Sequence, residues 1–140
     1  MKTVDWRALT ADLESPNVST CVRAAEALHA NTCAEDVPRL LELLKHESFF
    51  VREAAAWPLA ELQGPLLLPQ LLVAYQRGFD EGYDNDGFTA ALLEIPALHP
   101  EAAPVALKRY ISTSTEPLRG HAEWLLQFCA VNESSTVHDA

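Results

Sequence analysis

The sequence predicts an all-α protein built from repeated pairs of helices. Residues 51–59 and 118–126 carry the same pattern, in which an aliphatic residue and an arginine are followed by alanine in the fifth place, tryptophan in the seventh and leucine in the ninth. This spacing puts apolar residues on one helical face, and its return after many residues is typical of repeat architectures. The composition agrees, because 49% of the chain is hydrophobic, glycines number only 5, and no stretch alternates as strands do.

The chain has 140 residues, enough for one domain with a continuous core. We expect repeats over residues 1–131 and a disordered tail at residues 132–140. The charge is strongly acidic, with 20 Asp and Glu against 10 Lys and Arg. A net charge of −10 repels phosphate backbones and anionic lipid surfaces. We therefore expect neither nucleic acid nor a membrane as a direct partner.

The N-terminal part predicts the first pair of helices. A short helix that ends at residues 15–17 is marked by a stripe of Trp6, Leu9 and Leu13. A second helix over residues 18–30 has Ala24 and Leu28 in the places that correspond to Ala55 and Leu59. Its match to the pattern is loose, as is common in terminal repeats.

Two sets of markers predict three further pairs. Apolar stripes with a proline near the helix start surround Pro38, Pro69 and Pro104, which are 31 and 35 residues apart. The leucines in the ninth place of the second helices are 31, 33 and 34 residues apart: Leu28, Leu59, Leu92 and Leu126. Because the two series advance together, we expect about four pairs.

Paired helices, an early proline in the first and Val-Arg-x-x-Ala-x-x-x-Leu in the second resemble HEAT repeats over residues 4–131. The resemblance implies a right-handed α-solenoid of about four helical hairpins. The third pair departs from the pattern, with Asp84 and Asn85 in the aliphatic and arginine places and Phe88 in the alanine place. Tetratricopeptide repeats have a similar period, but their Trp-x-x-Leu-Gly-x-x-Tyr signature is absent.

A first candidate binding surface lies on the outer side of the second helices. Glu53 and Trp57 project away from the stripe that contains Ala55. Trp57 and Trp124 either pack against a neighbouring repeat or are exposed anchors. If they are exposed, Glu53 beside Trp57, and Glu123 beside Trp124, would supply the charged rim and apolar centre of a protein interface.

A second candidate surface is the segment over residues 78–87, which holds three of the five glycines. We expect a long acidic loop there, either recognising a partner or merely mobile. Its candidate contact residues are Asp80, Glu81, Tyr83, Asp84 and Asp86. No Lys or Arg occurs from residue 78 to residue 107. We expect Asn85 or Asp86 to cap the helix that follows.

The sequence predicts no metal site. Asp84-x-Asp86-Gly87 resembles the middle of an EF-hand loop, but that register puts Gly82 and Leu93 where carboxylate ligands are needed. Three cysteines, Cys21, Cys33 and Cys129, lack metal-ligand spacing and are expected to be free thiols in the core. Free thiols, together with the absence of a signal peptide or membrane span, indicate the cytoplasm.

The histidines and serines match no catalytic motif, and His46-Glu47 is a single pair where HEAT-like di-iron hydroxylases carry several. We expect a non-enzymatic protein without a cofactor. Its small size and acidity resemble HEAT-like immunity proteins that neutralise a basic toxin domain, often a nuclease. The alternative is a HEAT-like lyase or chaperone for a pigment or protein client, with an apolar groove lined by Trp57 and Trp124. HEAT-like DNA glycosylases need a basic groove, for which the charge is wrong.

Overall fold

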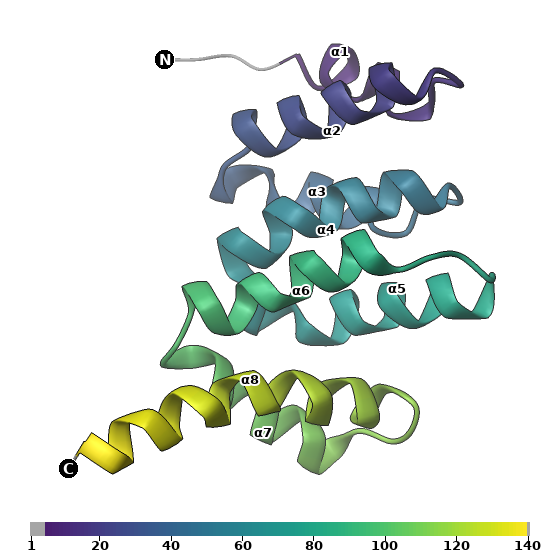
Figure 1. Ribbon diagram of the computed structural model, residues 1–140. Helices are drawn as coiled ribbons and strands as arrows, with labels where there is room; N and C mark the ends of the chain where they lie inside the picture. Colours follow the sequence, from purple (N-terminus) through teal and green to yellow (C-terminus); the bar gives the residue numbers. More distant parts are fainter. Residues whose placement is uncertain (1–4, 140) are drawn as a thin grey trace.

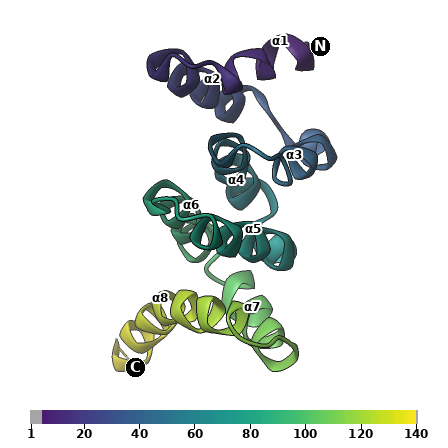
Figure 2. The same ribbon diagram turned by 90° about the vertical axis from the view of Figure 1, so that its right-hand side faces the viewer.

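The computed structural model describes the backbone of residues 5–139 and the side chains of residues 5–129. The predicted all-α class is confirmed, since this part of the chain forms helices and no strand. The helices follow one another in pairs stacked along one direction, with the N-terminus at one end and the C-terminus at the other (Figure 1). Figure 2 shows two layers, with α1, α3, α5 and α7 on one side and α2, α4, α6 and α8 on the other.

The helices correspond closely to those predicted. The first layer contains α1 (Trp6–Ala11), α3 (Val37–Leu43), α5 (Leu68–Asp80) and α7 (Ala102–Thr113). The second layer contains α2 (Val18–Asn31), α4 (Phe49–Gln63), α6 (Asp86–Leu98) and α8 (Leu118–Asp139). Short 3₁₀ helices η1 (Asp12–Glu14), η2 (Ala34–Asp36) and η3 (Gly64–Leu67) lie between them. The predicted disorder of residues 132–140 falls where side chains are not described, and it stays a prediction.

Local signals explain where most helices begin. Pro38 and Pro69 occupy the first turn of α3 and α5, where the missing N–H costs no helical hydrogen bond. The side chains of Asp5, Asn17 and Ser48 accept hydrogen bonds from backbone N–H groups at the starts of α1, α2 and α4. These are the residue types that cap helices most effectively.

The core lies between the two layers. The second helices bury Leu28, Leu59 and Leu92 completely. Phe88 is fully buried in the place that Ala55 occupies in α4, so the larger side chain is accommodated in the core. The last copy differs, because Leu126 is only half-buried and Leu125 is fully buried instead. No further pair follows α8 in the described chain, so the Leu126 side has less to pack against.

A side-chain hydrogen-bond donor recurs near the start of each helix of the second layer. The four residues have the same spacing as the ninth-place leucines: Cys21, Arg52, Asn85 and Arg119. Each donates to a backbone carbonyl just before its own helix or in the preceding helix. Arg52 and Asn85 are the buried polar residues of the described side chains. The position therefore ties each second helix to the chain before it, and Asn85 fulfils the role where the arginine pattern is lost.

The cysteines only partly match expectation. Cys129 is buried, Cys21 is half-buried, and Cys33 is exposed in the turn before η2. Cys33 lies outside the core because it precedes a helix start rather than occupying an inward-facing helical position. Among the described residues, none of the helices combines the length and apolarity needed to cross a bilayer.

Candidate binding pocket

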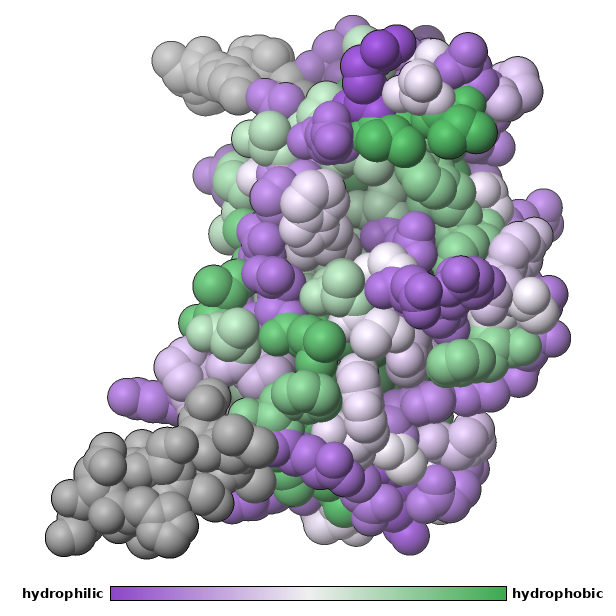
Figure 3. All heavy atoms as spheres, viewed as in Figure 1, coloured by the Kyte–Doolittle hydropathy of each residue, from purple (hydrophilic) through white to green (hydrophobic). Residues whose placement is uncertain are grey.

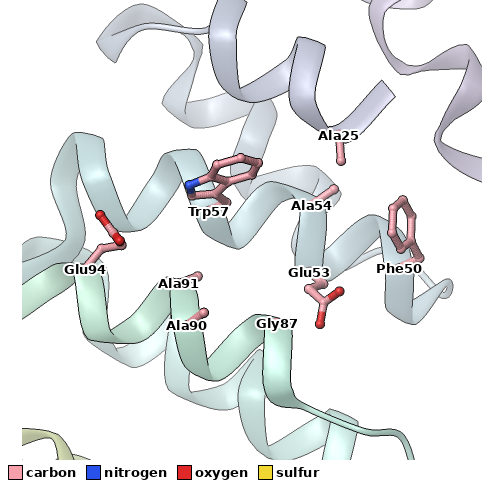
Figure 4. A pocket seen from close by; sticks show the side chains of 9 residues that line it. All are labelled: Ala25, Phe50, Glu53, Ala54, Trp57, Gly87, Ala90, Ala91 and Glu94. Atoms are coloured by element: carbon pink, nitrogen blue, oxygen red, sulfur yellow. The ribbon is translucent and has the colours of Figure 1, made fainter. Parts of the chain in front are cut away.

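An open pocket of about 380 Å³ lies where α2, α4 and α6 meet. It is on the face formed by the second layer of helices, where hydrophilic residues border a recessed apolar area (Figure 3). Five of its lining residues are small and leave the hollow: Ala25, Ala54, Gly87, Ala90 and Ala91. Four larger side chains surround them: Phe50, Glu53, Trp57 and Glu94 (Figure 4).

Glu53 reaches from α4 to the start of α6, where its carboxylate accepts a hydrogen bond from the backbone N–H of Phe88. Glycine at position 87 permits this approach, because a Cβ atom there would lie 2.6 Å from Glu53 Oε2. The expected cap by Asn85 or Asp86 is wrong. Asn85 stands at the N-cap without a capping bond, and its amide donates to the carbonyl of Tyr75 instead. The start of α6 is thus capped from a neighbouring helix.

The electrostatic environment of Glu53 is unfavourable to its charge. Burial raises the pKa of this carboxyl most, the Phe88 N–H opposes that rise, and the nearby carboxylates of Asp84 and Asp86 raise the pKa further. Negative charge is therefore concentrated at this end of the pocket. A cation placed there would be favoured by all three carboxylates.

The sequence left open whether Trp57 packs against a neighbouring repeat or is exposed, and the structure shows part of each. The His29 ring of α2 stacks on its indole with 3.8 Å between centroids and 10° between planes. His29 Nε2 is in turn 2.7 Å from Glu61 Oε1. Trp57 therefore packs against the preceding pair, yet it remains half-buried and borders the pocket. The indole is held in a fixed orientation with part of its surface accessible.

The loop expected over residues 78–87 is shorter in the structure. Helix α5 continues to Asp80 and α6 begins at Asp86, so only residues 81–85 connect them. Gly78 is buried within α5 against the Asn85 side chain, and Gly82 adopts a φ of 82° in the turn. Close packing and a left-handed turn conformation account for these two glycines. Asp84 Oδ1 accepts from the Asp86 N–H, which further orders the connection.

Glu81 forms ion pairs with two arginines of the same chain. Its two oxygens lie 2.5 Å from Arg52 Nη2 and 2.7 Å from Arg77 Nε. Hydrogen bonds from Arg77 and then Arg52 lower the pKa of Glu81. The carboxylate holds the turn to the buried Arg52, so we place it in the scaffold rather than in the binding surface. Asp80 is exposed and accepts a hydrogen bond from Gln76.

Tyr83 is exposed at the same turn. The residue is 51% accessible, and its ring stacks on the Phe49 ring with 4.6 Å between centroids. Phe79, at the end of α5, is also exposed and stacks on His121. Supported, accessible aromatic rings of this kind are common anchors in protein interfaces. The turn therefore keeps Tyr83 as a candidate contact residue.

The second tryptophan lies apart from the pocket. Trp124 of α8 is half-buried and packs edge-to-face on Phe128, while Glu123 is exposed. The pocket lining does not include Trp124, so the groove lined by both tryptophans that a lyase or chaperone would need is not formed by this pocket.

Sequence reasoning missed Phe50 and Glu94. A signal for the latter was present, because Gly87, Ala90, Ala91 and Glu94 follow i, i+3, i+4, i+7 spacing on α6. Such a stripe of small residues can leave a hollow when it faces another helix. Within the described part of the chain, no group of three or more His, Cys, Asp and Glu side chains is arranged to hold a metal ion. Comparisons with protein-family models, curated proteins and solved structures return no match to this chain.

Proposed function

We propose that this protein is a non-enzymatic binding module for a basic protein partner. The observation that carries the proposal is the pocket that places Glu53 and Glu94 beside Trp57, with no Lys or Arg in its lining. Aromatic residues at the centre of a contact and charged residues around them are features of protein interfaces. The nearby Asp84 and Asp86 extend the acidic surface to the turn that carries Tyr83.

The scaffold in this proposal is a right-handed α-solenoid of about four HEAT-like hairpins. Its support is the shared spacing of the buried leucines and of the side-chain donors at Cys21, Arg52, Asn85 and Arg119, together with the two layers of helices. In such a stack each pair contacts mainly its neighbours, and the second helices offer one long surface to a partner.

The partner class follows from charge. A protein with a net charge of −10 associates fastest with a partner of opposite sign. A basic toxin domain, for example a nuclease, fits this requirement, and an acidic inhibitor that covers its active surface would act as an immunity protein in the cytoplasm. The basic surface of a nuclease exists to attract phosphate, so an acidic protein competes directly for it.

Affinity capture from the native organism, followed by reconstitution of the purified pair, tests the proposal. We expect a captured protein of high isoelectric point whose association rate falls as salt shortens the Debye length from about 10 Å at 0.1 M to about 3 Å at 1 M. Glu94→Lys should weaken the purified complex, whereas Glu101→Lys should change affinity little. Glu101 is a suitable control because it gives the same change of net charge at the start of α7, in the other layer.

A partner that is acidic or neutral and associates at a rate independent of salt would reject the proposal. Equal weakening by Glu94→Lys and Glu101→Lys would show that the basic partner responds to the total charge and does not bind at this pocket.

A further inference from the structure

We infer that the pocket binds an arginine side chain of the partner, with the guanidinium against Trp57 and between Glu53 and Glu94. This inference rests on the proposed function and specifies the chemistry by which the partner is recognised.

The pocket has two anionic ends and an aromatic middle. In Figure 4 the carboxylates of Glu53 and Glu94 lie at opposite ends, with Trp57 between them and Ala90 and Ala91 along one wall. Glu53 lies against Gly87, and Glu94 follows seven residues later on α6, which is two turns or roughly 10 Å along the helix. One small ion cannot contact both carboxylates at that separation, whereas a long cationic side chain passes between them.

Neither carboxylate has a cation of its own. In the described part of the chain, the ion pairs involve Glu14, Glu42, Glu61 and Glu81, but not Glu53 or Glu94. Glu53 already accepts the Phe88 N–H, which holds the carboxylate in place while leaving further lone pairs for a donor from outside. Its partial burial makes an incoming positive charge more strongly attracted than at an open surface.

The Trp57 indole is held in place before any ligand binds. His29 covers the indole from one side, and Glu61 holds His29, so the ring loses little freedom when a ligand arrives. Indole is the best aromatic partner for a cation placed over its face. Binding to a ring that is already fixed costs less conformational entropy than binding to a mobile one.

The arrangement favours arginine over lysine. A guanidinium is planar, stacks on an aromatic face and presents five donors in a fork, whereas an ammonium is a compact and strongly hydrated charge. Stacking on Trp57 leaves the donors of a guanidinium directed outward in its own plane, toward the ends of the pocket where the carboxylates lie. A volume of about 380 Å³ is ample for one such side chain and some water.

The test uses a defined probe, the peptide acetyl-Ala-Ala-Arg-Ala-Ala-amide, with the arginine replaced by lysine or by neutral citrulline for comparison. Binding is followed by the NMR shifts of the Trp57 indole N–H and of the Ala90 and Ala91 amides in the full-length protein. We expect saturable shifts with the arginine peptide at a dissociation constant on the order of 1 mM, because the contacts with the two half-buried carboxylates and the one cation–π contact each contribute little. The lysine peptide should bind more weakly, and the citrulline peptide should cause no saturable shift.

Two pocket variants and one control locate the site. Glu94→Gln and Trp57→Phe should each weaken arginine-peptide binding roughly two- to fivefold, while Glu101→Gln should leave it unchanged. Because Trp57 also stacks on His29, a thermal melt checks that variant, and Glu94→Gln carries the test if Trp57→Phe is unstable. Equal shifts with arginine and citrulline, or equal affinities of Glu94→Gln and Glu101→Gln, would overturn the inference.

The two proposals can fail separately. If the purified basic partner binds with strong salt dependence but the arginine peptide does not perturb Trp57, arginine recognition is wrong and the proposed function stands. If the peptide binds as expected but no basic protein associates with the chain, the pocket chemistry stands and the proposed function is wrong.

Discussion

Replacing Arg52 by leucine should be among the most destabilising single changes in this protein. The Arg52 side chain has 0% accessibility and donates through Nη1 to the carbonyls of His46 and Glu47, each at 2.9 Å. Its Nη2 atom bonds to Glu81, which links the preceding turn to the one that carries Tyr83. Arg52→Leu keeps apolar bulk but removes every donor. Hydrogen bonds to charged groups contribute about 1.5–3 kcal/mol each, and leucine offsets part of that loss, so we expect a cost of about 2–4 kcal/mol.

The assay is urea unfolding followed by far-ultraviolet circular dichroism at pH 7. Arg119→Leu is the matched control, because Arg119 occupies the same place in α8 but is half-buried and donates only to the carbonyl of Ser114 among the described contacts. Its loss should cost about 1 kcal/mol. Should Arg52→Leu unfold at the wild-type urea concentration, or cost no more than Arg119→Leu, the argument from the buried donor would be refuted.

The cost of Arg52→Leu should also depend on pH. The pKa of Glu81 is lowered in the folded state, so its ion pairs contribute stability above the unfolded value near 4.5, and that contribution is lost as pH falls through the folded pKa. In acid the wild type loses the Arg52–Glu81 attraction, while the variant has none to lose. The difference in stability between the two should therefore narrow below about pH 4.5. A constant difference from pH 7 to pH 3 would show that this ion pair contributes nothing.

Three further predictions concern Glu53, Tyr83 and Leu59. Glu53→Gln keeps an acceptor for the Phe88 N–H and removes a carboxyl group whose pKa is raised on folding. The stability of the wild type should therefore fall relative to that of the variant as pH rises from about 4.5 through the folded pKa. Thermal melts at pH 4 and pH 7 measure this, and the same difference in stability at both pH values would contradict it. Tyr83→Ala should leave the melting temperature nearly unchanged but speed dissociation of the purified partner complex, as surface plasmon resonance would show; an unchanged dissociation rate would remove Tyr83 from the interface. Leu59→Ala should cost about 2–5 kcal/mol, and Leu126→Ala clearly less because Leu126 is half-buried; equal costs in urea unfolding would contradict the burial argument.

The helices and the register of the core could be predicted closely from the sequence. Prolines at Pro38 and Pro69 and the leucine series identify helix starts and inward faces, because helical periodicity depends on residues only a few positions apart. The same local reasoning singled out Glu53 and Trp57 as outward-facing, and both line the pocket. The stripe of small residues that ends at Glu94 indicated a hollow on α6, but it could not assign Glu94 to this site, because that depends on which face of α6 meets α4.

What the sequence by itself determined is the all-α class, the order of the helices and the residues available to a binding surface. Only the tertiary structure decided which carboxylates remain available. Glu81 is taken by Arg52, 29 positions earlier, and Glu53 caps a helix that begins 33 positions later, so charge runs in the sequence do not reveal the free charges. The physical reason is that a carboxylate's role depends on donors within a few ångströms, and in stacked helix pairs some of those donors come from the neighbouring pair, as Arg52 does for Glu81 in addition to Arg77 of its own helix.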